Sequence, residues 1–268
     1  MARASVLRLS LSPRILLHMC LILLAIDVVP NRPWLLLGNR DEFHARATAP
    51  AGEWSDRPGI VGGRDLVAGG SWLALHRNGR FAAVTNVRLP GTPPAPRSRG
   101  ELVGDFVGGS AAGLDYAADV GARRAQYGPF NLVVGAPGGV AFVSSIDGKS
   151  RSLGRGVHAF SNGSLEDEWP KMRRLRRGIE AMQQSGQWQD AAFLALLTDT
   201  HQPSDLDLPD TGVGIALERM LAPIFIRGAD YGTRACTLAY ANADGSMLLH
   251  ERRFGPDAKP LGETRLVL

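Results

Sequence analysis

The sequence predicts an α+β fold in which two antiparallel sheets pack against each other with helices on the outside. Three observations lead to this prediction. Predicted strands and helices occur in blocks rather than in strict alternation, the composition is that of a globular protein, with 44% hydrophobic and 21% charged residues, and 268 residues suffice for a sizeable core. Strand blocks on both sides of a helix block would leave both sheets buried on each face.

The first predicted block is a hairpin. Residues 20–29 form an apolar run typical of a buried strand, residues 30–33 carry the prolines and asparagine of a turn, and residues 34–38 return as a second strand. This hairpin ends in the polar run Asn39-Arg40-Asp41-Glu42.

The remaining elements follow from periodicity and turn residues. Strands are predicted at residues 71–76, 80–86, 130–135 and 140–146, and one further strand leads to residue 160. Helices are predicted at residues 100–107, 111–126, 169–184 and 190–198. Strands at residues 222–226, 235–242 and 246–252 close the chain, and residues 89–96 and 201–214 are predicted loops.

The helix at residues 169–184 has a clear apolar stripe. Met172, Leu175, Ile179 and Met182 recur at helical spacing, beside a basic run that extends over residues 171–177. We interpret the basic residues as the solvated face of this helix.

The first 18 residues superficially resemble a secretory signal, because three arginines precede the apolar residues 15–29. However, His18 and Asp27 interrupt that stretch, no small-residue cleavage site closes it, and it is too short to span a bilayer. We therefore interpret residues 1–18 as an upstream extension or propeptide and residues 19–268 as a single domain.

Composition limits the function classes. Two cysteines exclude a disulfide scaffold and a four-cysteine zinc site, and they fit a reduced, cytoplasmic compartment. The apolar run at residues 15–29 is too short for a stable membrane span. A net charge of +4 is too small to indicate nucleic-acid binding. The six histidines show no ligand-like i, i+4 pairing, so we expect no metal site.

Short motifs spread in order along residues 19–254 resemble the NRDE family, the bacterial relatives of transport and Golgi organisation protein two. The motifs are Met19-Cys20, Gly38-Asn39-Arg40-Asp41-Glu42-Phe43, Gly69-Gly70-Ser71-Trp72-Leu73, Thr85-Asn86, Arg99-Gly100-Glu101-Leu102-Val103, Gly128-Pro129-Phe130-Asn131-Leu132, Ser161-Asn162, Trp169-Pro170-Lys171 and Tyr231-Gly232-Thr233-Arg234. The resemblance implies the four-layer αββα sandwich of N-terminal nucleophile (Ntn) hydrolases, which agrees with the block pattern.

The resemblance also implies site residues. Cys20 would be the nucleophile, and Asn86 and Asn162 are similar to asparagines that lie near the oxyanion and the α-amino group in cysteine-type members of that fold. Arg40 or Asp41 would orient the nucleophile and its amine, and Arg234 resembles a late arginine of those enzymes.

The chemistry of that fold makes the position of Cys20 in the chain decisive. A thiolate attacks an amide carbonyl, and free cysteine has a pKa of about 8.5, so a base must take the proton. In Ntn enzymes the base is the nucleophile's own α-amino group, whose ordinary pKa of about 7.7 to 8.0 suits neutral pH. Removal of residues 1–19 would supply this amine.

Each of these residues also has a structural interpretation. Cys20 could be a buried thiol in a first strand, and Asn86 could cap a strand end. Arg40 could form a buried ion pair with Asp41 or Glu42 that holds the hairpin, and residues 231–234 could be a loop entering a strand.

Two functional classes remain open. The first is a cysteine-nucleophile hydrolase of non-peptide amide C–N bonds, which acts on a small-molecule amide and requires no cofactor. The second, implied by the family resemblance, is a non-enzymatic haem-binding, haem-transfer or lipid-handling protein. Because there is no C-x-x-C-H motif, haem would be a reversible ligand. The oligomeric state is not predicted.

Overall fold

The computed structural model describes residues 19–89 and 91–268. The expectation that residues 1–18 are an extension or propeptide lies outside the described residues. The described chain forms two antiparallel sheets, one with six strands in the order β10-β1-β2-β11-β12-β13 and one with seven in the order β3-β4-β5-β6-β7-β8-β9. We call them the first and the second sheet.

The first sheet contains β1 (Met19–Val29), β2 (Arg32–Phe43), β10 (Gly156–Phe160), β11 (Tyr231–Ala241), β12 (Met247–Phe254) and β13 (Pro260–Val267). The second sheet contains β3 (Thr48–Glu53), β4 (Ile60–Asp65), β5 (Leu73–His76), β6 (Arg80–Asn86), β7 (Phe130–Ala136), β8 (Gly139–Ser144) and β9 (Ser150–Leu153).

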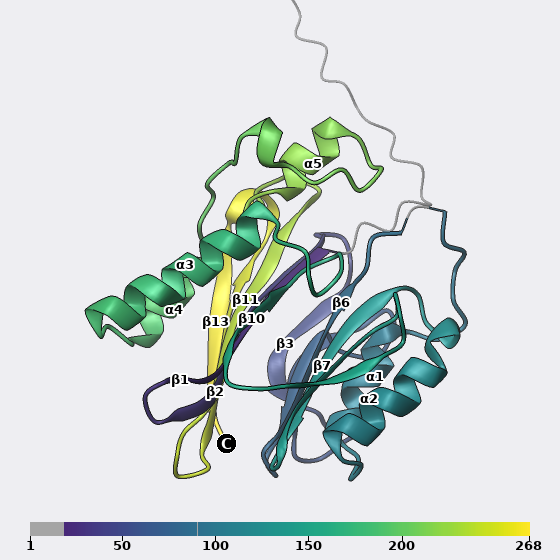
Figure 1. The fold of residues 1–268 in the computed structure, drawn as a ribbon, viewed down its shortest axis with the longest axis vertical. Coiled ribbons are helices and arrows are strands. Elements are labelled where there is room, and N and C mark those ends of the chain that lie inside the picture. Colours follow the sequence, from purple (N-terminus) through teal and green to yellow (C-terminus); the bar gives the residue numbers. More distant parts are fainter. Residues whose placement is uncertain (1–18, 90) are drawn as a thin grey trace, which may run out of the picture.

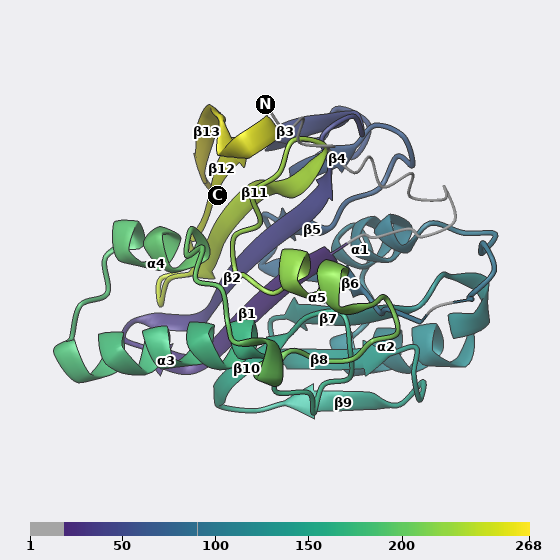
Figure 2. The same ribbon diagram turned by 90° about the horizontal axis from the view of Figure 1, so that it is seen from above.

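Helices cover both outer faces. α3 (Pro170–Ser185) and α4 (Asp190–Leu197) pack on the first sheet, and α1 (Arg99–Val107) and α2 (Gly113–Ala122) pack on the second. Figure 1 shows the resulting layers side by side, with α3 and α4 at the left and α1 and α2 at the right, and Figure 2 shows them from above. The predicted four-layer αββα sandwich is therefore confirmed.

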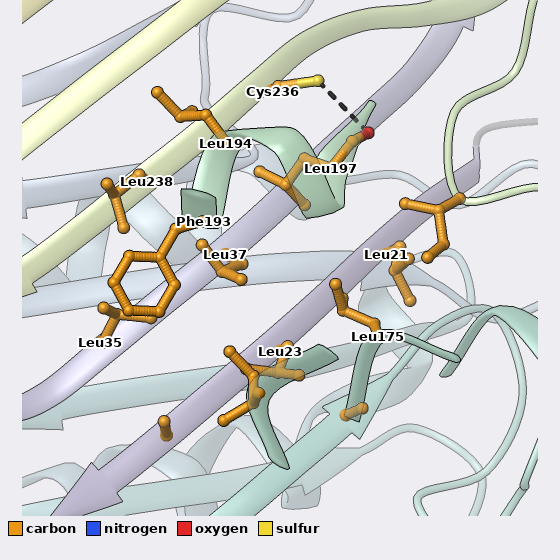
Figure 3. Close-up of a cluster of buried hydrophobic side chains, with 14 of the residues drawn as sticks. Leu21, Leu23, Leu35, Leu37, Leu175, Phe193, Leu194, Leu197, Cys236 and Leu238 are labelled. Carbon is orange, nitrogen blue, oxygen red and sulfur yellow. Dashed lines mark hydrogen bonds between the residues drawn. The ribbon is translucent and has the colours of Figure 1, made fainter. Parts of the chain in front are cut away.

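Alternation along the strands builds a separate apolar layer on each side of a sheet. On β1, Leu21 and Leu23 face α3 and α4, whereas Ile22 and Leu24 face the second sheet, because successive side chains point to opposite faces. Figure 3 shows the helix-facing layer, where Leu175 and Phe193 pack over the leucines of β1 and β2. A third layer lies between the second sheet and α1 and α2.

The predicted hairpin is confirmed, but β2 is longer than expected. It continues through the polar run to Phe43, and its residues pair with β1 on one side and β11 on the other. The polar run is therefore a central part of the first sheet and not a loop at the end of a hairpin.

Three expectations about elements were wrong or incomplete. The single strand leading to residue 160 is two strands, and β9 pairs in the second sheet whereas β10 pairs in the first. Residues 222–226 are not a strand. The Phe225 N–H donates to the carbonyl of Asp199 in a loop, and the Ile224 carbonyl accepts from the Asn39 side chain. β3, β4, β13 and the short α5 (Ile215–Leu221) were not predicted. None of the helices in the described chain has the length and apolarity needed to cross a membrane.

Candidate active site

The site lies at the end of the sandwich where β1 begins and β2 ends. Across the first sheet, Cys20 on β1 is paired with Arg40 on β2, Arg40 with Ala235 on β11, and Ala235 with Arg253 on β12. Because directly opposite residues of antiparallel strands share a face, these side chains form one row. By alternation the row faces the second sheet, like Ile22 and Leu36.

The Cys20 thiol is buried, and its environment disfavours the thiolate. Burial raises its pKa to about 12, and the nearby Asp41 carboxylate adds to this effect while Arg40 opposes it. The thiol of a chain that still carries Met19 is therefore protonated at neutral pH, and its activation needs a further group.

Asp41 is buried on the opposite face of β2 from Arg40. The Thr233 hydroxyl accepts from the Ile226 N–H and donates to Asp41 Oδ1 at 2.5 Å. Asp41 Oδ2 has no hydrogen-bond partner among the described residues. Burial raises the pKa of this carboxyl to about 6, and the attraction of Lys171 lowers it in part.

Lys171 is buried, although the basic run of its helix predicts a solvated position. It is only 4% exposed in the first turn of α3, and its Nζ donates to the Leu221 carbonyl at 3.3 Å. Burial lowers its pKa to about 8, while Asp41 and Cys20 favour its charged form. Its spacing of four residues before Leu175 places it on the apolar stripe, and this spacing could have revealed its burial.

Asn86 and Asn162, the two asparagines that the resemblance places near the oxyanion and the α-amino group, are hydrogen-bonded to each other. Asn162 follows β10, and its Nδ2 donates to the backbone oxygen of Asn86 at 3.0 Å and to Oδ1 at 2.7 Å. The Ser161 hydroxyl lies 2.8 Å from the carbonyl oxygen of Cys20 and 2.9 Å from Asn162 Oδ1, and it donates to one of these oxygens. The Ser161 hydroxyl thus lies between Asn162 and the backbone of Cys20.

Arg40 and Arg234 lie together beside a pocket with a volume of about 260 Å³. Arg40 forms an ion pair of 3.7 Å with the buried Glu42, which agrees with its structural interpretation, and its guanidinium lies over the Trp72 ring. Arg234 stands at an irregularity of β11, where Nη1 donates to the carbonyls of Phe43 and Arg46.

A further arginine lies at the start of α1, the helix that packs on the outer face of the second sheet. Arg99 begins α1 and donates to the carbonyl of Pro129 at 3.2 Å. Burial lowers the pKa of Arg99, while Cys20 and Glu42 favour its charged form. The only sequence signal for Arg99 is that it begins the motif Arg99-Gly100-Glu101-Leu102-Val103.

In the described part of the chain, no group of three or more His, Cys, Asp or Glu side chains is placed so that it could hold a metal ion. What the site offers is a thiol, a buried carboxylate, a buried ammonium group, two linked amides and several guanidinium groups.

Comparisons with known proteins agree with this architecture. The family model for transport and Golgi organisation 2 matches residues 19–256. The mouse transport and Golgi organization 2 homolog is 30% identical over 255 residues, which cover 87% of this chain and 92% of the relative. The human homolog is 31% identical with the same coverage.

A solved structure shows the same fold at low sequence identity. The C2A mutant of a conjugated bile acid hydrolase from Clostridium perfringens superposes with a TM-score of 0.51 and 9% identity, covering 93% of this chain and 92% of that one. This likeness confirms the Ntn-hydrolase-like fold that the motifs imply.

Proposed function

Because the chain belongs to the transport and Golgi organisation 2 family and has an Ntn-hydrolase-like fold, we propose that it is a cysteine-nucleophile hydrolase of non-peptide amide C–N bonds. Cys20 is the nucleophile, and its own α-amino group is the base once residues 1–19 are removed.

The observation that carries the proposal is that Oδ2 of the buried Asp41 has no hydrogen-bond partner in the described part of the chain. The Cα atoms of Met19 and Asp41 are directly paired, so the nitrogen of Cys20, which is bonded to residue 19, lies beside Asp41. A buried carboxylate oxygen without a donor is costly. A free α-ammonium group at Cys20 would supply a charged donor at this position.

In the proposed reaction the α-amino group takes the proton of the Cys20 thiol, and the thiolate attacks the amide carbonyl. The Asn86 side chain accepts a hydrogen bond from Asn162 at Oδ1, and its Nδ2 can donate to the tetrahedral oxyanion. The ammonium group returns its proton to the leaving amine, and water then hydrolyses the thioester.

The test compares two chains that differ only in the amine. One chain is initiated at Met19, so that removal of the initiator methionine exposes Cys20, and the other carries one additional alanine before Cys20. Both contain Cys236→Ala, so that Cys20 is the only thiol. Amino-terminal sequencing establishes each start, and iodoacetamide at about pH 7.5, near the ordinary pKa of an α-amino group, measures the reactivity of the thiol.

We expect the chain with the free amine to be alkylated at least about 100-fold faster, because the amine activates a thiol whose pKa is otherwise about 12. Only this chain should hydrolyse N-acyl aminocoumarins of different acyl length, and Cys20→Ser and Cys20→Ala should abolish the hydrolysis. Equal alkylation rates and no amine-dependent hydrolysis would exclude the proposed mechanism.

Haem or lipid carriage is the second candidate, and the pocket beside Arg40 is the observation that bears on it. Its three arginines could pair with the carboxylates of haem, but its lining residues include no histidine, cysteine or methionine that could ligate the iron. A saturable Soret shift that persists in Cys20→Ala and is lost on replacement of the pocket arginines would favour this candidate.

A further inference from the structure

We propose that the pocket lined by Arg40, Arg234 and Arg253 binds an anionic group of an amphipathic substrate, so that the hydrolase acts on amides that carry a carboxylate or a similar anion. The catalytic part of this inference rests on the proposed function. The binding part stands on the pocket itself.

The pocket is lined by both charged and apolar side chains. Arg40 on β2, Arg234 on β11 and Arg253 on β12 provide the guanidinium groups. Pro50, Trp72, Phe254 and Leu261 provide the apolar surface. A ligand that fills such a pocket needs an anion next to an apolar or aromatic body.

Of the three guanidinium groups, Arg234 is the one without an ion pair among the described residues, since Arg40 lies 3.7 Å from Glu42 and 3.9 Å from Asp65. Glu251 is the single carboxylate among the lining residues, and its Oε1 already accepts from the Ala51 N–H at 2.8 Å and lies 3.5 Å from Arg253 Nη1. Arg234 donates to backbone carbonyls, which carry no net charge. Burial and the neighbouring Arg40 both lower the pKa of Arg234, so an incoming anion would relieve repulsion between the two guanidinium groups.

The pocket is aligned with the nucleophile. Cys20, Arg40, Ala235 and Arg253 occupy successive strands in one row, and neighbouring strands are about 4.8 Å apart. Ala235 places only a methyl group between Arg40 and Arg253, which leaves room for a ligand above the sheet. An anion held between these arginines, above Ala235, therefore lies about 10 Å along the sheet from the Cys20 backbone.

The experiment measures binding of a matched pair of probes to the Cys20→Ala chain, in which no turnover can occur. The probes are 2-naphthylacetate and 2-naphthylacetamide, which differ in charge but hardly in shape. We expect the acid to bind at least tenfold more tightly than the amide, and Arg234→Gln and Arg253→Gln each to remove most of this preference.

Arg252→Gln is the control, because Arg252 is adjacent on β12 but points to the other face, where it pairs with Glu263 at 3.1 Å. This variant should keep the preference. If Arg253→Gln does not fold, Ala235→Leu provides the second test, since a larger side chain between the arginines should weaken binding of both probes.

Equal binding of acid and amide, absence of binding by either, or a preference that survives the arginine substitutions would overturn the anion pocket. These outcomes are distinct from failure of the proposed function. Acid-selective binding without hydrolysis in the amine-bearing chain would support the anion pocket and contradict the proposed hydrolase. Hydrolysis without a preference for anionic amides would support the hydrolase and contradict the role of the pocket in substrate choice.

Discussion

Asp41 and Lys171 are two buried charged side chains that burial pushes toward their neutral forms. The carboxyl pKa rises from 3.8 to about 6 and the ammonium pKa falls from 10.5 to about 8, although each group favours the charged form of the other. Removing two ions from water often costs more than their attraction returns. We infer that this pair lowers the stability of the fold.

The first prediction concerns the pH dependence of stability. Between pH 3.8 and about 6 the folded chain holds a proton on Asp41 that the unfolded chain has lost, so the free energy of unfolding falls as pH rises through this window. The rise in pKa from 3.8 to about 6 corresponds to a loss of about 3 kcal/mol. Asp41→Asn cannot titrate at this position. In urea denaturation, the free energy of unfolding of the variant relative to that of the natural chain should therefore rise by this amount from about pH 4 to 7.

Lys171→Met provides the control for this assignment. Without the ammonium group the pKa of Asp41 should rise further, and the window of falling stability should extend to higher pH. Profiles that run parallel for the natural chain and Asp41→Asn between about pH 4 and 6 would show that Asp41 is not the group responsible.

At the scale of elements, the centre of the second sheet depends on a glycine opposite an aromatic ring. Phe81 on β6 is directly paired with Gly135 on β7, and a Cβ atom at Gly135 would lie 2.0 Å from the Phe81 ring. The ring also packs against Trp34 of the first sheet, with centroids 4.2 Å apart. Close packing across the sheets therefore requires glycine at this position.

We expect Gly135→Ala to lower the free energy of unfolding by about 1 to 3 kcal/mol through overpacking, as measured by urea denaturation. Combining it with Phe81→Leu should cost less than the sum of the single changes, because the smaller side chain removes the clash. Gly52→Ala on β3 is the matched control, since its Cβ would meet nothing within 4 Å and stability should hardly change. Strict additivity of the first two substitutions would contradict this account.

At the scale of the whole molecule, local sequence patterns predicted central strands of both sheets. They did not predict the edge strands β3 and β13 or the change of sheet between β9 and β10. β1, β6 and β7 are apolar runs between clear turns, so their existence followed from the sequence. β3 and β13 lie at sheet edges, where polar and small residues replace the apolar pattern. The passage from β9 to β10 changes sheets within two residues, and no local pattern indicates which sheet a strand joins.

The candidate site was predictable only in part for a related reason. The resemblance supplied Cys20, Asp41 and the two asparagines, and the structure brings them to one end of the sandwich. Lys171 was missed because a lysine in a basic helical run usually faces solvent. Its place four residues before Leu175 indicates a buried position, but the partner of its ammonium group, the Leu221 carbonyl at the end of α5, is a long-range contact that spacing does not reveal.

The Asn86 and Asn162 amides join the two sheets at the site. Asn162 follows β10 of the first sheet and Asn86 ends β6 of the second, and Thr85 Oγ1 donates to the Ser161 carbonyl at 2.6 Å beside them. Because these groups are buried, loss of one partner leaves the other without a hydrogen bond. This junction holds the two sheets together at the site and positions the proposed oxyanion donor.

We therefore expect Asn162→Ala to cost about 1 to 3 kcal/mol of stability and Asn86→Ala less, because Asn162→Ala also leaves the Asn86 backbone carbonyl without this donor. In a double-mutant cycle the pair should show a coupling of about 1 to 2 kcal/mol, whereas Asn86→Ala and the distant Asn242→Ala should be additive. If Asn86 donates to the oxyanion, Asn86→Ala should also lower kcat in the amine-bearing chain under conditions in which it is fully folded. A coupling energy of zero would show that the two sheets are not joined through these amides. An unchanged kcat in Asn86→Ala would show that the two asparagines have a structural role only.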